Sequence, residues 1–235
     1  MPIDHWFPLA VYYQDLPEAT AHKKQLIDAA LQLEQDGYER RAFPEMAWTG
    51  DLHGAEQIHT DPRFAWIVSQ VEHHVQRYLR KLGLDLGQID LYIQRGWPVL
   101  SRYQQEVGSH CHNTANISAV YYVSVPNSGS DEAGSLVFFD DSRVNEISPG
   151  LGSENTNIIT EWNALNQDQA VYLPTEGRLI LFPAKQRHGV TINHTEEVRI
   201  SLSFDIVLTA KPGNAAGSYE FLPPPLTQWK KISQS

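Results

Sequence analysis

The part of the sequence after Gly83 is a succession of short apolar runs, each bounded by Gly, Pro, Asn or Asp residues. Runs of this length and spacing predict antiparallel strands that pack as a sandwich or close into a barrel. The predicted strands cover residues 89–95, 99–103, 117–125, 135–139, 170–173, 178–182, 189–192 and 198–208.

Two helices are predicted before this β-rich part. Residues 18–36 follow Pro17 and carry apolar side chains at helical spacing. Residues 61–81 begin with Asp61, a suitable N-cap, and repeat the same spacing over a longer stretch. The expected fold class is therefore α+β, with N-terminal helices packed on one sheet of the β-rich part.

The length, composition and net charge of the chain limit the functions as well as the folds that are compatible with it. A chain of 235 residues can bury one real core, and we expect a single domain with a helical part at 1–88, a β core at 89–210 and a tail at 211–235. The formal charge of −10, without any cluster of basic residues, argues against nucleic acid or an anionic membrane as a partner. Cys111 is the only cysteine, and no signal-like or bilayer-length apolar run is present, so we expect a cytoplasmic protein.

A His-Cys-His sequence at residues 110–112 is the first candidate for chemistry. On a strand, or at a strand end, alternation places His110 and His112 on one face and Cys111 on the other. Two imidazoles on one face can ligate one metal ion, and Cys111 would then be an ordinary buried thiol. The pair alone fits two solvated histidines at a surface strand end equally well.

His188 is the second candidate, because it follows the apolar run 179–182 and a turn containing Pro183. The turn would deliver His188 to the start of the next strand. A single histidine in such a position is more often structural than functional. Its interpretation therefore depends on the residues around it.

The last predicted strand carries Arg199 on a cleanly alternating pattern. Its apolar residues share one face, while Arg199, Ser201, Ser203 and Asp205 share the other. On an edge strand this polar face would lie in water. On a barrel strand it would line a pocket, where an arginine and a nearby serine suit a carboxylate.

Five fragments in this order resemble the 2-oxoglutarate/Fe(II) oxygenase family. They are His-x-His at 110–112, the run 118–123, the run 134–140, the run 177–183 with His188, and Arg199-Ile200-Ser201. The resemblance covers about residues 97–208, with a weaker similarity at residues 48–51. It implies a double-stranded β-helix, a jelly-roll barrel that holds iron at its mouth.

The resemblance also implies site residues and cofactors. It makes His110 and His188 metal ligands, and assigns Arg199 and Ser201 to the distal carboxylate of 2-oxoglutarate, with Tyr103 and Tyr122 as further contacts. Fe(II), 2-oxoglutarate and O2 would be required, with ascorbate as a reductant. The implied reaction hydroxylates a C–H bond of an amino acid, peptide or small metabolite and releases succinate and CO2. A homodimer is compatible with the resemblance, although no residue pattern indicates one.

One position departs from the wider superfamily, which usually supplies two histidines and one carboxylate. His112 occupies the place of that carboxylate. Three alternatives follow: His112 completes a three-histidine site, which we favour; Asp140 or Asp141 enters instead; or the position is left to water or halide.

Two other functions fit part of the pattern. One is a cupin-like enzyme with a three-histidine metal that does not use 2-oxoglutarate, and the other is a jelly-roll binding protein without catalysis. Arg199 separates them, since only the 2-oxoglutarate hypothesis needs an anion there. The polar segment 140–169 is either a lid over the substrate or a surface loop.

Overall fold

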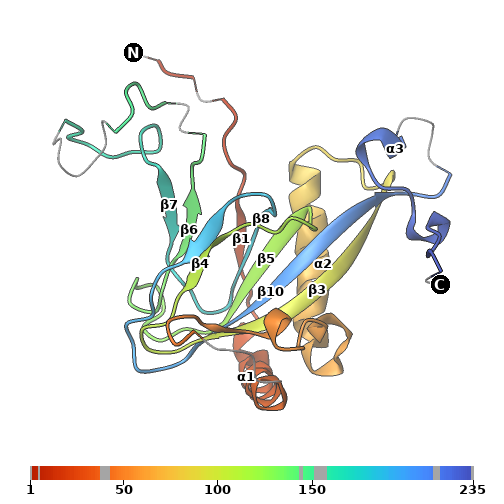
Figure 1. The fold of residues 1–235 in the computed structure, drawn as a ribbon, viewed down its shortest axis with the longest axis horizontal. Helices are drawn as coiled ribbons and strands as arrows, with labels where there is room; N and C mark the ends of the chain where they lie inside the picture. The colour runs from red at the N-terminus through yellow and green to blue at the C-terminus, as the bar shows by residue number, and fades with distance from the viewer. Residues whose placement is uncertain are drawn as a thin grey trace.

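The computed structural model describes residues 2–4, 6–37, 43–142, 145–150, 158–213 and 218–233. Within these ranges, ten strands form two antiparallel sheets, and two long helices cover one of them (Figure 1). The elements are β1 (Tyr12–Asp15), α1 (Ala19–Asp36), β2 (Trp48–Thr49), α2 (Ala65–Lys81), β3 (Ile89–Ser101), β4 (Val107–His110), β5 (Ile117–Ser124), β6 (Leu136–Phe139), β7 (Gln169–Tyr172), β8 (Arg178–Pro183), β9 (His188–Val190), β10 (Arg199–Ala210) and α3 (Ser218–Phe221).

The larger sheet has the order β1-β8-β5-β10-β3-β2, and the smaller sheet has the order β4-β9-β6-β7. Sequence neighbours such as β8 and β9 lie in different sheets, as expected for a jelly roll. The fold class predicted from the sequence, an α+β double-stranded β-helix with helices on one sheet, is confirmed. None of the helices in the described ranges is long and apolar enough to cross a bilayer.

Both predicted helices form, because each carries a continuous apolar stripe. Helix α1 buries Leu26 and Ala30, and α2 buries Ile67 and Val71 against the outer face of the large sheet. Asp61 caps a short 3-10 turn that leads into α2, where its side chain accepts a hydrogen bond from the backbone N–H of Arg63. This burial leaves the inner face of the sheet for the site.

Strand β10 has both faces buried, so the edge-strand interpretation of its polar face is wrong. It lies between β5 and β3 in the large sheet. Ile200, Leu202 and Phe204 belong to the core under the helices, whereas Arg199 and Ser203 face the other way and line a cavity between the sheets. The two-residue alternation read from the sequence therefore separates a packing face from a pocket face.

Some predicted boundaries are wrong. Residues 89–95 and 99–103 were predicted as two strands but form the single strand β3, which ends at Ser101. Proline has no N–H to donate to a neighbouring strand. Pro98 is tolerated because an irregular segment, not a regular strand, borders β3 at this point, where the Gly96 N–H donates to the Glu56 carbonyl at 2.9 Å. The sequence patterns also missed the short strands β1, β2 and β4.

Gly96 gives a stability test of the packing between β3 and β10. A Cβ on Gly96 would lie 2.7 Å from Cδ1 of the Phe204 ring. We expect Gly96→Ala to lower the free energy of unfolding by about 1–3 kcal/mol, because the core must shift to admit the methyl group. Gly108→Ala is the matched control, since the nearest atom to its Cβ is Met46 Cε at 3.9 Å. Equal stability of both variants in denaturant titrations would contradict this account.

Candidate metal and anion site

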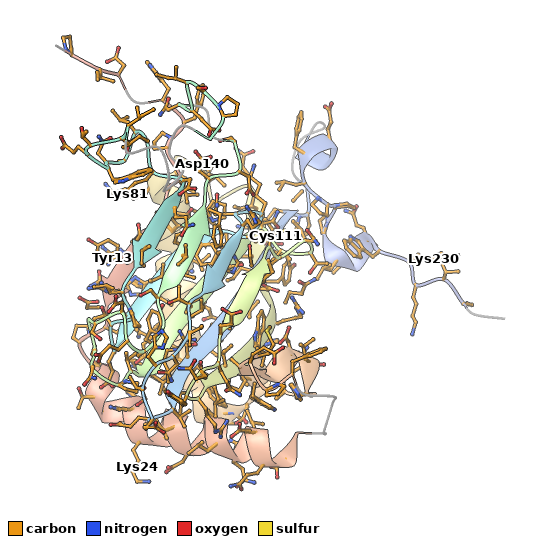
Figure 2. All side chains as sticks on the ribbon, turned by 60° about the vertical axis from the view of Figure 1, so that its left-hand side comes forward. Tyr13, Lys24, Lys81, Cys111, Asp140 and Lys230 are labelled. Carbon is orange, nitrogen blue, oxygen red and sulfur yellow. The ribbon has the colours of Figure 1, made fainter. Side chains whose placement is uncertain are left out.

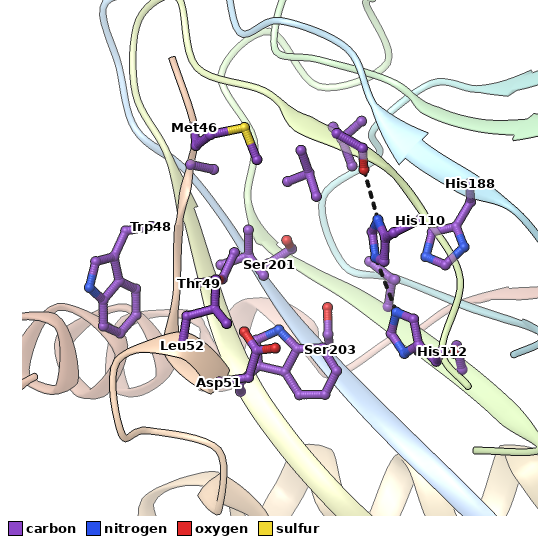
Figure 3. Close-up of a pocket in the computed structure, with 18 of the residues that line it drawn as sticks. Met46, Trp48, Thr49, Asp51, Leu52, His110, His112, His188, Ser201 and Ser203 are labelled. Carbon is purple, nitrogen blue, oxygen red and sulfur yellow. Dashed lines mark hydrogen bonds between the residues drawn. The ribbon is translucent and has the colours of Figure 1, made fainter. Parts of the chain in front are cut away.

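The three candidate histidines meet at the mouth of the cavity between the sheets. His110 ends β4 and His188 begins β9, and the two residues are directly opposite in the ladder between these strands. His112 follows two residues after His110, and one ligand atom from each of the three residues lies within 4.8 Å of the others. Figure 3 shows the three imidazoles grouped on one side of the cavity.

The hydrogen bonds of the three rings leave their Nε2 atoms for a metal ion. Nδ1 of His110 bonds to the Gly108 carbonyl, and Nδ1 of His188 bonds to the Gln186 carbonyl, each at 2.8 Å. Nδ1 of His112 bonds to the Asp205 carboxylate. Because each Nδ1 must donate to its oxygen partner, each Nε2 can offer a lone pair.

The spacing of the nitrogens also fits one cation. His110 Nε2 and His112 Nε2 are 3.2 Å apart, close enough to share a proton or to ligate one ion together. Two nitrogens at about 2.1 Å and roughly 90° around one ion would be about 3 Å apart. Burial lowers the pKa of His188 to about 3, so its imidazole is neutral at physiological pH and suited to metal binding. The residues present therefore fit a divalent metal ion.

The carboxylate alternatives lie elsewhere. Asp141 forms an ion pair with Arg187, with Nε to Oδ1 at 2.7 Å, and Asp140 Oδ1 accepts a hydrogen bond from the Ser142 hydroxyl at 2.6 Å. Neither carboxylate lines the cavity or belongs to the group of potential metal ligands found among the described residues. His112 is the residue that the structure brings to the third position.

Asp205 is a functional candidate that sequence reasoning did not single out. Its side chain has no exposed area, and it bonds to His112 across 93 residues of sequence as well as to Arg95 Nε at 3.1 Å. Burial raises the pKa of Asp205, but the hydrogen bonds from His112 and Arg95 outweigh it and hold this pKa below its usual value. Asp205 is therefore an ionised acceptor that orients His112.

The cavity has a volume of about 970 Å³ and extends from the histidines to the inner face of β10. Its apolar wall beside the histidines is formed by Trp97, Val99 and Val107, and the Trp97 ring lies 5.7 Å from the His112 ring. Residues 43–53 border its opposite side. None of the described residues of 140–169 lines the cavity, so the lid hypothesis gains no support there.

Arg199 is buried in this cavity without a carboxylate partner among the residues that the structure describes. It is 1% exposed, its Nη1 donates to the Gly134 carbonyl at 3.2 Å, and its Nε has no partner. The Tyr122 hydroxyl is likewise buried without a partner. Burial lowers the pKa of Arg199, which reflects the cost of keeping a cation away from water. That cost is several kcal/mol, and an anion bound in the cavity would offset it.

Of the other predicted site residues, two line the cavity and one does not. Ser201 and Tyr122 pair with each other in the ladder between β10 and β5, and both line the cavity. Tyr103 does not line it: the side chain is 51% exposed in the turn after β3, and the structure does not bring it to the other predicted site residues. Cys111 is partly exposed rather than buried, and its thiol lies 3.4 Å from the Asn113 side-chain oxygen (Figure 2 marks its position).

A family model described as "Putative 2OG-Fe(II) oxygenase" matches residues 95–205. This part of the chain therefore resembles the 2-oxoglutarate/Fe(II) oxygenase family in sequence. The matched region runs from Arg95 in β3 to Asp205 in β10, so it contains the three histidines, Tyr122 and Arg199. None of the curated proteins matches the chain in sequence.

Solved structures of this oxygenase fold resemble the chain at low sequence identity. HygX from Streptomyces hygroscopicus, solved with nickel and 2-oxoglutarate, has a TM-score of 0.54 at 13% identity, with 84% of this chain and 82% of HygX covered. SnoK, an alpha ketoglutarate dependent carbocyclase from nogalamycin biosynthesis, has a TM-score of 0.54 at 16% identity and coverages of 92% and 88%. A Pseudomonas putida prolyl-4-hydroxylase has a TM-score of 0.50 at 15% identity and coverages of 84% and 92%.

Metal affinity tests the role of Asp205. We expect Asp205→Asn to weaken nickel binding by about 10- to 100-fold, because the neutral amide no longer holds the His112 ring in one tautomer. Calorimetric titration of the metal-free protein measures this directly. Asp141→Asn is the control, since that carboxylate pairs with Arg187 outside the cavity. Unchanged affinity in a folded Asp205→Asn protein, or a loss with Asp141→Asn, would refute the assignment.

Proposed function

We propose that the chain is an Fe(II)- and 2-oxoglutarate-dependent dioxygenase that hydroxylates an unactivated C–H bond of a small molecule, amino acid or peptide. The single observation that carries the proposal is the pairing of two features in one cavity. A cluster of three imidazoles suits iron, and Arg199, buried and lacking a carboxylate partner among the described residues, suits the far end of a dicarboxylate. The match of residues 95–205 to the oxygenase family model supports the same conclusion.

The roles of the residues follow from their contacts. His110, His112 and His188 would hold the metal ion on one side and leave the side facing the cavity open for co-substrate and oxygen. Arg199 would bind the distal carboxylate of 2-oxoglutarate through its unpaired Nε–H. The Tyr122 hydroxyl would donate to the same group; burial raises the pKa of Tyr122, so its phenol keeps its proton. Ser201 stands next to both and can add a third hydrogen bond.

When bound, iron(II) with 2-oxoglutarate supplies oxygen activation, in which the co-substrate becomes succinate and CO2 and one oxygen atom is left for the substrate. The protein contributes position and exclusion of water. Trp97 and Val99 make the wall beside the histidines apolar, which limits hydrolytic and proton-leak side reactions near the metal. Asp205 keeps His112 in one orientation throughout.

The affinity for 2-oxoglutarate tests the anion site. We expect Arg199→Lys to weaken 2-oxoglutarate binding to the nickel-loaded protein by at least about tenfold, because lysine cannot reproduce the fork of donors. Anaerobic calorimetry with nickel in place of iron gives the dissociation constant without turnover. Arg178→Lys is the control, because that arginine pairs with Asp15 at 2.6 Å outside the cavity. If both variants bind 2-oxoglutarate like the parent, the cavity is not the co-substrate site.

Succinate release tests the reaction class. Iron-loaded protein should convert 2-oxoglutarate to succinate at a slow rate without a substrate, and His188→Ala should abolish both this turnover and tight metal binding. Metal binding without any succinate release would instead favour a three-histidine enzyme that does not use 2-oxoglutarate. Absence of metal binding would favour a binding protein without catalysis.

A further inference from the structure

Asp51 is a carboxylate in the same cavity that no step of the proposed reaction uses. It lies in a 3-10 turn, η1 (Gly50–Leu52), directly after β2, and lines the cavity. Its side chain is 21% exposed, and it accepts no hydrogen bond from any residue in the described ranges. In Figure 3 its carboxylate points toward the side of the cavity on which Ser203 and the three histidines lie.

Asp51 forms only a long ion pair with its nearest cation, Arg95. Arg95 Nη1 is 3.9 Å from Asp51 Oδ2, too far for a hydrogen bond. The same guanidinium uses Nε and Nη2 for Asp205, which is fully buried. Two carboxylates thus lie beside one guanidinium. Asp205 accepts both of its hydrogen bonds, and Asp51, which lines the cavity, accepts none. A partly buried carboxylate in this state favours a cationic donor.

The backbone holds Asp51 firmly in this position. Gly50 has backbone atoms packed so closely on β3 that a Cβ would lie 2.7 Å from Cδ of Pro98. The Gly50 carbonyl accepts from His53 N–H at 3.0 Å and Ala55 N–H at 2.8 Å, and the Trp48 and His53 rings stack at 5.2 Å. A preorganised acceptor loses little entropy on binding a ligand, which raises the affinity for a donor of the right shape.

Apolar side chains also border the cavity near Asp51. Leu52 is 52% exposed and Met46 is 38% exposed, and both line the cavity. Exposed apolar side chains gathered at one opening mark a surface that binds an apolar group. Asp51 therefore offers a carboxylate beside exposed apolar side chains in the cavity that leads to the histidines.

From this arrangement we infer that the substrate is an amphipathic small molecule with a protonated amine, which Asp51 binds while the apolar body lies against Leu52 and Met46. The inference rests on the proposed oxygenase function, because it takes the cavity as the substrate site. It adds the chemical class of the substrate and a residue that selects it. Holding the amine at Asp51 would bring neighbouring aliphatic carbons along the apolar wall toward the histidines.

Matched ligand pairs test the inference by binding rather than turnover. The probes are hexylamine, cyclohexylmethylamine and 2-phenylethylamine, each with its N-acetyl derivative and the corresponding alcohol. Binding is measured anaerobically at pH 7 on protein loaded with nickel and 2-oxoglutarate. We expect at least one amine to bind about tenfold or more tightly than its neutral partners, since a charge-assisted hydrogen bond is much stronger than a neutral one.

Two variants assign the preference to one residue. Asp51→Asn should remove the preference for the amine and leave the melting temperature unchanged, because Asp51 accepts no hydrogen bond within the described part of the protein. Glu34→Gln is the matched control: Glu34 also lines the cavity, but Arg102 binds both of its oxygens, at 2.6 and 2.8 Å. The Glu34→Gln protein should keep the preference of the parent.

The inference is overturned if no amine binds more tightly than its neutral partners, or if the preference persists in Asp51→Asn. Neither result affects the proposed function, which depends on succinate release and on 2-oxoglutarate binding in the absence of these probes. Conversely, loss of 2-oxoglutarate binding in the parent protein would refute the proposed function whether or not the amines bind.

Discussion

The whole arrangement depends on β10 having two buried faces with different tasks. One face supplies Ile200, Leu202 and Phe204 to the core beneath the helices. The other places Arg199 and Ser203 in the cavity and Asp205 in contact with His112, so that one strand serves the anion site, the cavity wall and the support of His112. Packing of the first face fixes the register of the second, because a slip of one residue would exchange the two sets of side chains.

The sequence predicted this strand well because its alternation is strict over eight residues, and alternation is a direct consequence of strand geometry. It also predicted that His110 and His112 share a side, since that argument needs only local backbone geometry. The meeting of these residues with His188 could not be derived from spacing alone. It depends on the pairing of β4 with β9, which belongs to the tertiary fold and entered only through the family resemblance.

Where the prediction failed, nonlocal contacts decided the outcome. The family resemblance suggested Tyr103 as a contact of the co-substrate, but β3 ends at Ser101 and the Tyr103 side chain is exposed outside the cavity. Asp205 looked like one more polar residue on its strand, and only its contacts with Arg95 and His112 show its importance. Asp51 ended a weak family similarity at residues 48–51 that gave it no role, because its place in the cavity comes from the packing of an irregular loop on β3.

The pairing of β6 with β7 has a consequence for how such a protein can vary. Phe139 lies opposite Gln169 at the end of the ladder, and Asp140 N–H bonds to the Asp168 carbonyl at 2.8 Å, so the chain between them leaves and re-enters the sheet at one point. Lengthening a loop closed in this way costs only about 0.6 kcal/mol for each doubling of its length. Insertions and deletions between residues 140 and 168 can therefore accumulate with little effect on the spacing of the histidines, and this excursion is where related chains are free to diverge in length.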